Sequence, residues 1–170
     1  NVSVSNTDND TAGITITPTA GLITTEAGGT ATFTVVLNSQ PSADVTIGLT
    51  SSDTTEGTIA PTSLTFTNGN WNVAQTVTVT GVDDAYDDGN VTYPIALGKA
   101  TSADPKYQDS DPADPSVTTV DDDTASLVLG APSGTRTNER GTAITFDVHL
   151  GARPVSNVTV PIVSSDTTEG

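Results

Sequence analysis

The chain has 170 residues, with 21 Asp and Glu against 5 Lys and Arg, and its formal net charge is −16. This charge disfavours a nucleic acid or an anionic membrane as a partner, because the phosphates would be repelled. The absence of Cys excludes disulfides, thiolate metal ligands and cysteine nucleophiles. No apolar run approaches the roughly 18–20 residues that a membrane-spanning helix needs, so membrane insertion is not expected.

Alternation of apolar and polar residues predicts an all-β fold. Threonine is abundant, and the usual helix formers Glu, Lys and Leu are scarce. In Thr30–Leu37 the apolar residues Ala, Phe, Val and Leu occupy alternate positions, which is the period of a strand with one buried face. Further expected strands cover residues 14–17, 44–50, 63–67, 74–80, 90–97 and 116–120. Turn residues at 38–41, 57–61 and 68–69 separate them, so we expect an antiparallel two-sheet sandwich.

A long internal repeat sets the expected domain boundaries. The heptapeptide SSDTTEG begins at Ser51 and again at Ser164, and the same shift of 113 residues aligns about four in ten overlapping positions without a gap. We expect residues 1–10 to close a preceding repeat, residues 11–123 to form a complete repeat, and residues 124–170 to be the first half of the next. The chain would then be an interior piece of a longer polypeptide, or copies would complete one another by donating strands.

Clustered acidic residues predict a metal site. Four crowd one expected loop and three crowd the repeat boundary: Asp83, Asp84, Asp87 and Asp88, then Asp121, Asp122 and Asp123. Carboxylates at such spacing repel one another, and converging loops would increase the repulsion. Ca²⁺ relieves it, because this ion takes about 6–8 oxygen ligands and tolerates flexible loops, whereas Mg²⁺ demands stricter geometry. A solvated acidic surface is the alternative; the loop pattern of an EF-hand is absent.

Four features occur together in the complete repeat. They are Glu26 followed by Gly28-Gly29 before an alternating strand, Asp53 in a Thr-rich loop, Val77–Thr80 running into Asp83-Asp84, and the terminal Asp121-Asp122-Asp123. Together they resemble the Calx-β domain, an immunoglobulin-like sandwich found in sodium–calcium exchangers and in large bacterial surface proteins. The resemblance implies a calcium cluster at one end of each sandwich.

The ligand set that this resemblance implies follows the same positions. It comprises Glu26, Asp53, Asp83, Asp84, Asp121, Asp122 and Asp123, with Asp87 and Asp88 as the nearest further candidates. In the neighbouring repeats, the shift of 113 residues adds Asp8 and Asp10 on one side and Glu139 and Asp166 on the other.

Enzymatic chemistry finds little support in the sequence. The single histidine, His149, falls where the preceding repeat has Val36, and a catalytic group is not expected to be exchanged for valine. The chain lacks a GxSxG motif and a phosphate-binding glycine loop. Trp71, the only tryptophan, is expected to cover one end of the core, with a sugar-binding platform as the alternative. We therefore expect no enzyme.

The expected function is a calcium-binding structural repeat of an extracellular surface protein, an adhesin or filament of bacterial type. Calcium would stabilise each sandwich and stiffen the joints, since Asp123 runs into the next expected strand without a flexible linker. The expected partners are neighbouring repeats or other copies, with a cell-surface or carbohydrate ligand elsewhere in the full protein. The alternatives are an accessory carbohydrate- or protein-binding module of a secreted multidomain enzyme, and a calcium-signalling module.

Overall fold

The computed structural model describes residues 1–7, 9–138, 140–165 and 167–168. The chain divides into two compact units, the first made of Asn1–Asp84 and Asp88–Asp122 and the second of Ala85–Asp87 and Asp123–Gly170. All regular structure among these described residues is β-strand, so none of them belongs to a helix that could cross a membrane. The all-β prediction is confirmed.

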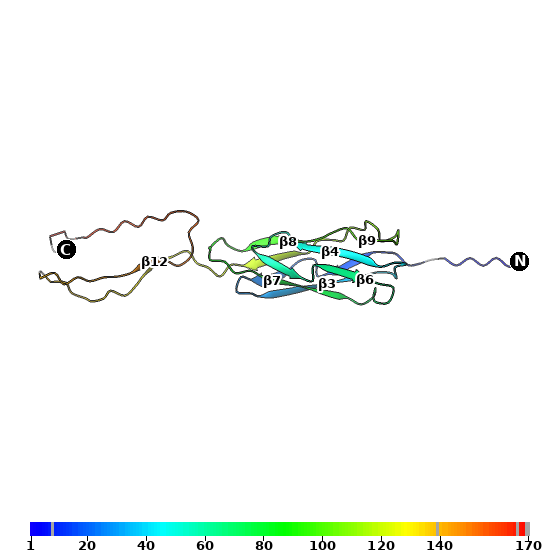
Figure 1. Cartoon of the computed structure of the whole chain (residues 1–170), viewed down its shortest axis with the longest axis horizontal. Coiled ribbons are helices and arrows are strands. Elements are labelled where there is room, and N and C mark those ends of the chain that lie inside the picture. The colour runs from blue at the N-terminus through cyan, green and yellow to red at the C-terminus, as the bar shows by residue number, and fades with distance from the viewer. Residues whose placement is uncertain (8, 139, 166, 169–170) are drawn as a thin grey trace. The chain divides into compact units, whose positions relative to one another are not determined.

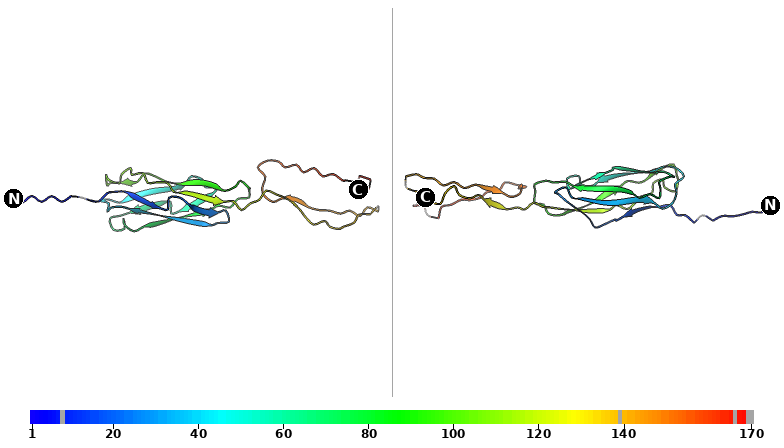
Figure 2. Two further views of the ribbon diagram at one scale, coloured as in Figure 1. Left: turned by 180° about the vertical axis from the view of Figure 1, so that it is seen from behind. Right: turned by 90° about the horizontal axis from the view of Figure 1, so that it is seen from below.

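The first unit is a sandwich of two sheets, visible as two layers of arrows in Figure 1. One sheet has the order β1-β3-β7-β5, with strands at Ile14–Thr17, Thr30–Leu37, Gln75–Gly81 and Gly57–Ala60. The other has the order β2-β10-β8-β4-β6, with strands at Leu22–Thr25, Ser116–Val120, Val91–Leu97, Val45–Ser51 and Ser63–Phe66. The short strand β9, Thr101–Ser102, pairs with β4. Figure 2 shows the same layers from behind and from below.

Alternate side chains of both sheets form the core. Phe33 of β3 lies opposite Val77 of β7, and Val45 of β4 lies opposite Phe66 of β6; all four are buried. Threonine fills many of the outward positions, where its branched side chain suits a pleated surface. Trp71 is partly buried and packs against the core, in agreement with the prediction that it covers part of the core.

Most of the strand predictions hold, with ends that differ by no more than one residue, but the turn predicted at 57–61 is wrong. Gly57–Ala60 forms β5, which pairs with β7. Gly57 begins this strand because its backbone passes close to the Tyr93 hydroxyl, with which a Cβ would collide. Glycine and proline are typical of turns, and their presence here led to the prediction of a turn where a short strand lies.

The direction of one strand pair also differs from the prediction. β2 and β10 run parallel, whereas the sequence predicted a wholly antiparallel sandwich. β2 escaped prediction because one of its inward side chains is polar: the Thr24 hydroxyl lies 2.9 Å from that of Thr119, and both threonines are buried. Hydrogen bonding between the two hydroxyls lets β2 bury a residue that reads as solvent-facing in the sequence.

Two buried side chains hold the long loop after β9 against the sandwich. The Tyr107 hydroxyl donates to the Ser39 carbonyl oxygen at 2.7 Å and accepts from the Ser39 N–H at 3.1 Å. Asp104 accepts from the N–H groups of Ser42 and Lys106, at 2.7 and 2.9 Å, and these bonds lower the pKa of its carboxyl. Acidic residues of this loop therefore have a structural role.

The second unit contains the antiparallel pair β11, Leu127–Leu129, and β12, Val148–Leu150. Within this unit the guanidinium of Arg153 lies 5.0 Å from the centre of the Tyr86 ring. The division into units falls close to the predicted boundary after Asp123. The assignment of residues 1–10 and 124–170 to neighbouring repeats stays a prediction.

Candidate metal centre

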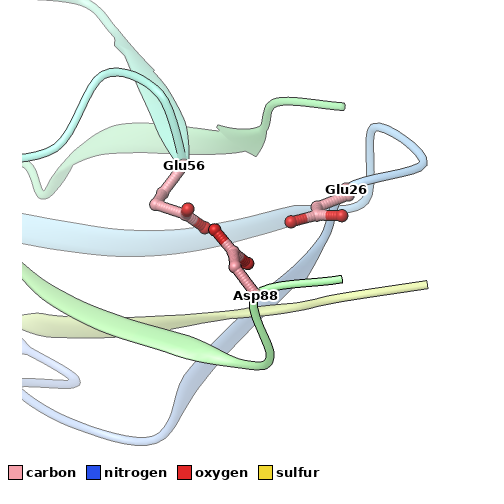
Figure 3. Close-up of side chains that lie close together, drawn as sticks. All are labelled: Glu26, Glu56 and Asp88. Carbon is pink, nitrogen blue, oxygen red and sulfur yellow. The ribbon is translucent and has the colours of Figure 1, made fainter. Parts of the chain in front are cut away.

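Three carboxylates from distant parts of the sequence converge at one end of the first unit. Carboxylate oxygens of Glu26, Glu56 and Asp88 lie within 4.8 Å of one another, and Figure 3 shows the three side chains pointing toward a common point. An oxygen of Asp121 also lies within 4.8 Å of one from Glu26. We call these four residues the carboxylate cluster.

The sheet topology explains why Glu26 and Asp121 meet. β2 and β10 are parallel neighbours, so the residues that follow them leave the same end of the sheet. The Glu26 N–H donates to the Val120 carbonyl oxygen at 3.1 Å, which continues the pairing one residue beyond the strands. A parallel pair therefore places two carboxylates side by side.

Antiparallel pairing brings the other two carboxylates to the same end. β8 runs opposite to β10, so Asp88, which precedes β8, lies near the residue that follows β10. The Gly89 N–H donates to Asp121 Oδ2 at 2.6 Å and fixes this loop. Glu56 precedes β5, and its carbonyl oxygen accepts from Val82, directly after β7, at 3.0 Å. Each ligand candidate is thus fixed by a strand end.

The cluster has an excess of negative charge, and two of its four carboxylates are buried. Glu26 is 2% exposed and Glu56 is 5% exposed. The Oε2 atom of each has no hydrogen-bond partner among the described residues. Burying a carboxylate oxygen without a partner costs free energy unless a cation or a proton neutralises it.

The pKa values reflect this environment. Burial, followed in order of importance by the nearby charges of Asp121, Asp84, Glu56 and Asp88, raises the pKa of Glu26 to about 7. Burial, followed by the charge of Asp88, also raises the pKa of Glu56. Both groups therefore resist ionisation when no cation is present.

Glu56 is the site residue that the sequence analysis missed. The predicted residue of this loop, Asp53, directs Oδ1 to the N–H and hydroxyl of Thr55, at 3.1 and 2.6 Å, and these bonds lower its pKa. Asp53 thus closes the turn that presents Glu56. The duplicated heptapeptide could not single out Glu56, because it repeats Asp53 as Asp166 just as it repeats Glu56 as Glu169.

The remaining predicted residues fall into three groups. Asp84 is half-buried and close enough for its charge to raise the pKa of Glu26, whereas Asp83 and Asp122 are exposed in the same region of the chain. Asp87 belongs to the second unit, where Oδ2 accepts from the Ala125 N–H at 2.6 Å, and Asp123 begins the main part of that unit. Asp10 is exposed, and Asp8, Glu139 and Asp166 lie outside the described residues. A ligand role for each stays a prediction.

The fold and the cluster together define an all-β sandwich module with a carboxylate-lined end suited to a hard divalent cation. No protein-family profile and no curated protein matches the chain. Among solved structures, it is similar to "CBD12 from CALX1.2", with a TM-score of 0.50 and 17% identity over 64% of this chain and 44% of that one. This likeness supports the sandwich fold.

Two further solved structures resemble the chain. The apo-form Calx CBD1 domain is 19% identical over 65% of this chain and 96% of that one, with a TM-score of 0.48. The structure described as calcium binding domain CBD12 of CALX1.1 is also 19% identical, over 64% of this chain and 44% of that one, with a TM-score of 0.47. The chain spans less than half the length of both CBD12 structures.

Proposed function

We propose that this chain is a calcium-binding structural module in a tandem array of an extracellular surface protein, an adhesin or a filament of bacterial type. Calcium at the carboxylate cluster stabilises the sandwich and stiffens the joint to the next repeat. The observation that carries the proposal is the convergence of two buried glutamates, each with an oxygen that lacks a described hydrogen-bond partner, with Asp88 and Asp121.

The donor set favours calcium over other cations. All candidate ligands are carboxylate oxygens on loops, and the chain has no Cys and no second His that would favour zinc. Calcium tolerates the irregular spacing of loop carboxylates, whereas Mg²⁺ requires an octahedral arrangement and retains its water. Extracellular calcium is abundant enough to occupy sites of roughly 10⁻⁴–10⁻³ M affinity, so an extracellular location would not require a tight site.

The calcium proposal is tested by titrating the full chain with CaCl₂ in a calorimeter. We expect Glu56→Gln to weaken calcium binding by about tenfold or more, because one buried anionic ligand is lost. Asp44→Asn is the matched control, because it removes the same charge from an exposed position. Asp44 precedes β4, whereas Glu56 follows the opposite end of that strand. Equal affinity in the Glu56→Gln variant and the wild-type chain would contradict the proposed site.

The stiffening of joints rests on the sequence around Asp121–Asp123, where a repeat boundary carries three carboxylates and no Gly/Ser or Pro linker. Neutralisation of these charges by calcium would remove the repulsion that lets a joint swing. Small-angle scattering of the chain in calcium and in EDTA measures the effect. We expect a narrower distribution of dimensions in calcium; an unchanged distribution with calcium bound would leave only the stabilising role.

The module is proposed to have no catalytic activity. His149 is an exposed residue of β12, opposite Val128. The alternative of a carbohydrate-binding module has less support, because Trp71 packs against the core and offers only part of its ring to a ligand. The expected partners are adjacent repeats or other copies of the same protein.

A further inference from the structure

The second unit reproduces the strand pairing of the first. Leu127 of β11 lies opposite Leu150 of β12. The shift of 113 residues carries this pair onto Ile14 and Leu37, which lie opposite one another in β1 and β3. The remaining positions of β11 and β12 follow the same register. Sequence similarity alone does not require this identity of pairing, so it is independent support for structural equivalence.

A turn is reproduced as well. In the second unit Gly141 has φ of 90°, and its N–H donates to the Asn138 carbonyl oxygen at 3.0 Å. Its counterpart in the first unit, Gly28, has φ of 83°, and its N–H donates to the Thr25 carbonyl oxygen at 3.1 Å. Both glycines adopt the left-handed conformation that other residues rarely take. The pair β11–β12 and this turn therefore match the β1–β3 part of the first unit, whereas the described residues 151–165, which correspond to the region of β4, form no strand.

The two units differ in what covers their apolar side chains. Phe146 is 50% exposed, whereas its counterpart Phe33 is 1% exposed. Val158 is 54% exposed, whereas its counterpart Val45 is completely buried. Ile162 is likewise exposed, although its counterpart in β4 is buried. Exposed large apolar side chains at positions that are buried in the first unit indicate a surface that another segment covers.

The first unit shows which strands cover these positions. Phe33 lies opposite Val77 of β7, and Val45 lies opposite Phe66 of β6. Apart from Gly57, which begins β5, the strands that complete the first unit belong to residues 58–123, which we call the second-half segment. Its apolar side chains are spaced to meet those of the first half, because the register of each pairing is fixed.

We propose that the exposed apolar face of the second unit is a docking surface for one occupant, a polypeptide with the strand pattern of the second-half segment. A second copy of this chain does not supply it, because the second-half segment of each copy is already paired with residues 14–51. The docking buries Phe146, Val158 and Ile162 as their counterparts are buried. This inference does not depend on the calcium proposal, because it rests on apolar contacts and register.

The test appends a copy of residues 58–123 to the full chain after Gly170. The seven residues that precede the appended segment are the same as those that precede it in the first unit, so the sequence context is preserved. We expect amide hydrogen exchange of residues 143–165 to slow by about tenfold or more, because local opening of the second unit becomes unfavourable. The control is the same chain with Val77→Asp and Leu97→Asp in the appended copy only.

Disulfide trapping provides a second measurement that a partial folding defect does not obscure. The chain has no Cys, so Phe146→Cys and Val77→Cys in the appended copy create a single possible bridge. We expect it to form under mild oxidation, since cross-strand partners have Cβ atoms about 4.5–5.5 Å apart. Thr78→Cys in place of Val77→Cys points to the opposite face and should form little bridge.

The outcomes separate clearly. Slower exchange and a bridge specific to position 77 support the docking surface. Unchanged exchange in residues 143–165 together with no preferential bridge, while the first unit keeps its protection, would overturn it. Sedimentation of the unextended chain adds the last outcome: if it is a dimer whose residues 143–165 are already protected, the face pairs with a second copy and the proposed occupant is wrong.

Discussion

The metal-free chain is expected to lose stability as the pH rises from 4.5 to 7. Burial and neighbouring carboxylates raise the pKa of Glu26 from an ordinary value of 4.5 to about 7 in the folded chain. Between these two values the folded chain binds more protons than the unfolded chain. The contribution of Glu26 to the free energy of unfolding is therefore fully present below about pH 4.5 and falls as the pH rises to about 7.

The magnitude follows from the two pKa values of Glu26. A difference of one in pKa corresponds to about 1.4 kcal/mol, so the rise from 4.5 to about 7 sets a ceiling of about 3–4 kcal/mol for this group. Solvent beside the half-buried and exposed members of the cluster screens part of the repulsion, so we expect about half of that value. The raised pKa of Glu56 adds to the effect in the same direction.

The assay is urea unfolding in EDTA at a series of pH values, followed by the fluorescence of Trp71, which lies in the first unit. We expect Glu26→Gln to remove much of the pH dependence, because its amide does not titrate. With saturating calcium the dependence should reverse, since ion binding requires deprotonated carboxylates. An equally steep fall in the Glu26→Gln variant, or stability that rises with pH in EDTA, would refute the reasoning.

The other predictions concern residues that the structure assigns to stability. Tyr107→Phe should lower the free energy of unfolding by about 1–3 kcal/mol, because the buried Ser39 backbone loses its hydroxyl partner; chemical denaturation measures this, and no change would contradict the role of the loop. Gly57→Ala should destabilise the first unit by about 1–3 kcal/mol, since the added Cβ collides with the Tyr93 hydroxyl. Combining Gly57→Ala with Tyr93→Phe should recover part of that loss, and an additive result would exclude the collision.

The fold was predictable where strands alternate cleanly. Thr30–Leu37 shows the alternation at every position except Val36, and its bounds were predicted without error. β5 and β2 were not predictable, because Gly57 begins the first and Thr24 occupies an inward position in the second. Their strand character comes from tertiary contacts, the approach of Tyr93 and the Thr119 hydroxyl, which the local sequence does not contain.

The site was predictable in kind and only partly in its members. Glu26 and Asp121 were predicted and do meet, as do Asp88 and Glu26. The loop between β4 and β5 carries two acids three residues apart, and the sequence favoured Asp53 over Glu56. Only the turn geometry distinguishes them: the Asp53 carboxylate accepts hydrogen bonds from Thr55, whereas the Glu56 carboxylate points into the cluster.

The parallel pairing of β2 with β10 has a mechanical consequence. One strand lies near the start of the sandwich and the other ends it, and Leu22–Thr25 and Val117–Val120 lie side by side in register. Once β1 has separated from β3, tension applied to the two ends of the domain pulls β2 and β10 past each other lengthwise. Their hydrogen bonds must then rupture together, whereas an antiparallel hairpin under tension opens one bond at a time. The domain is thus built to resist stretching along its own axis.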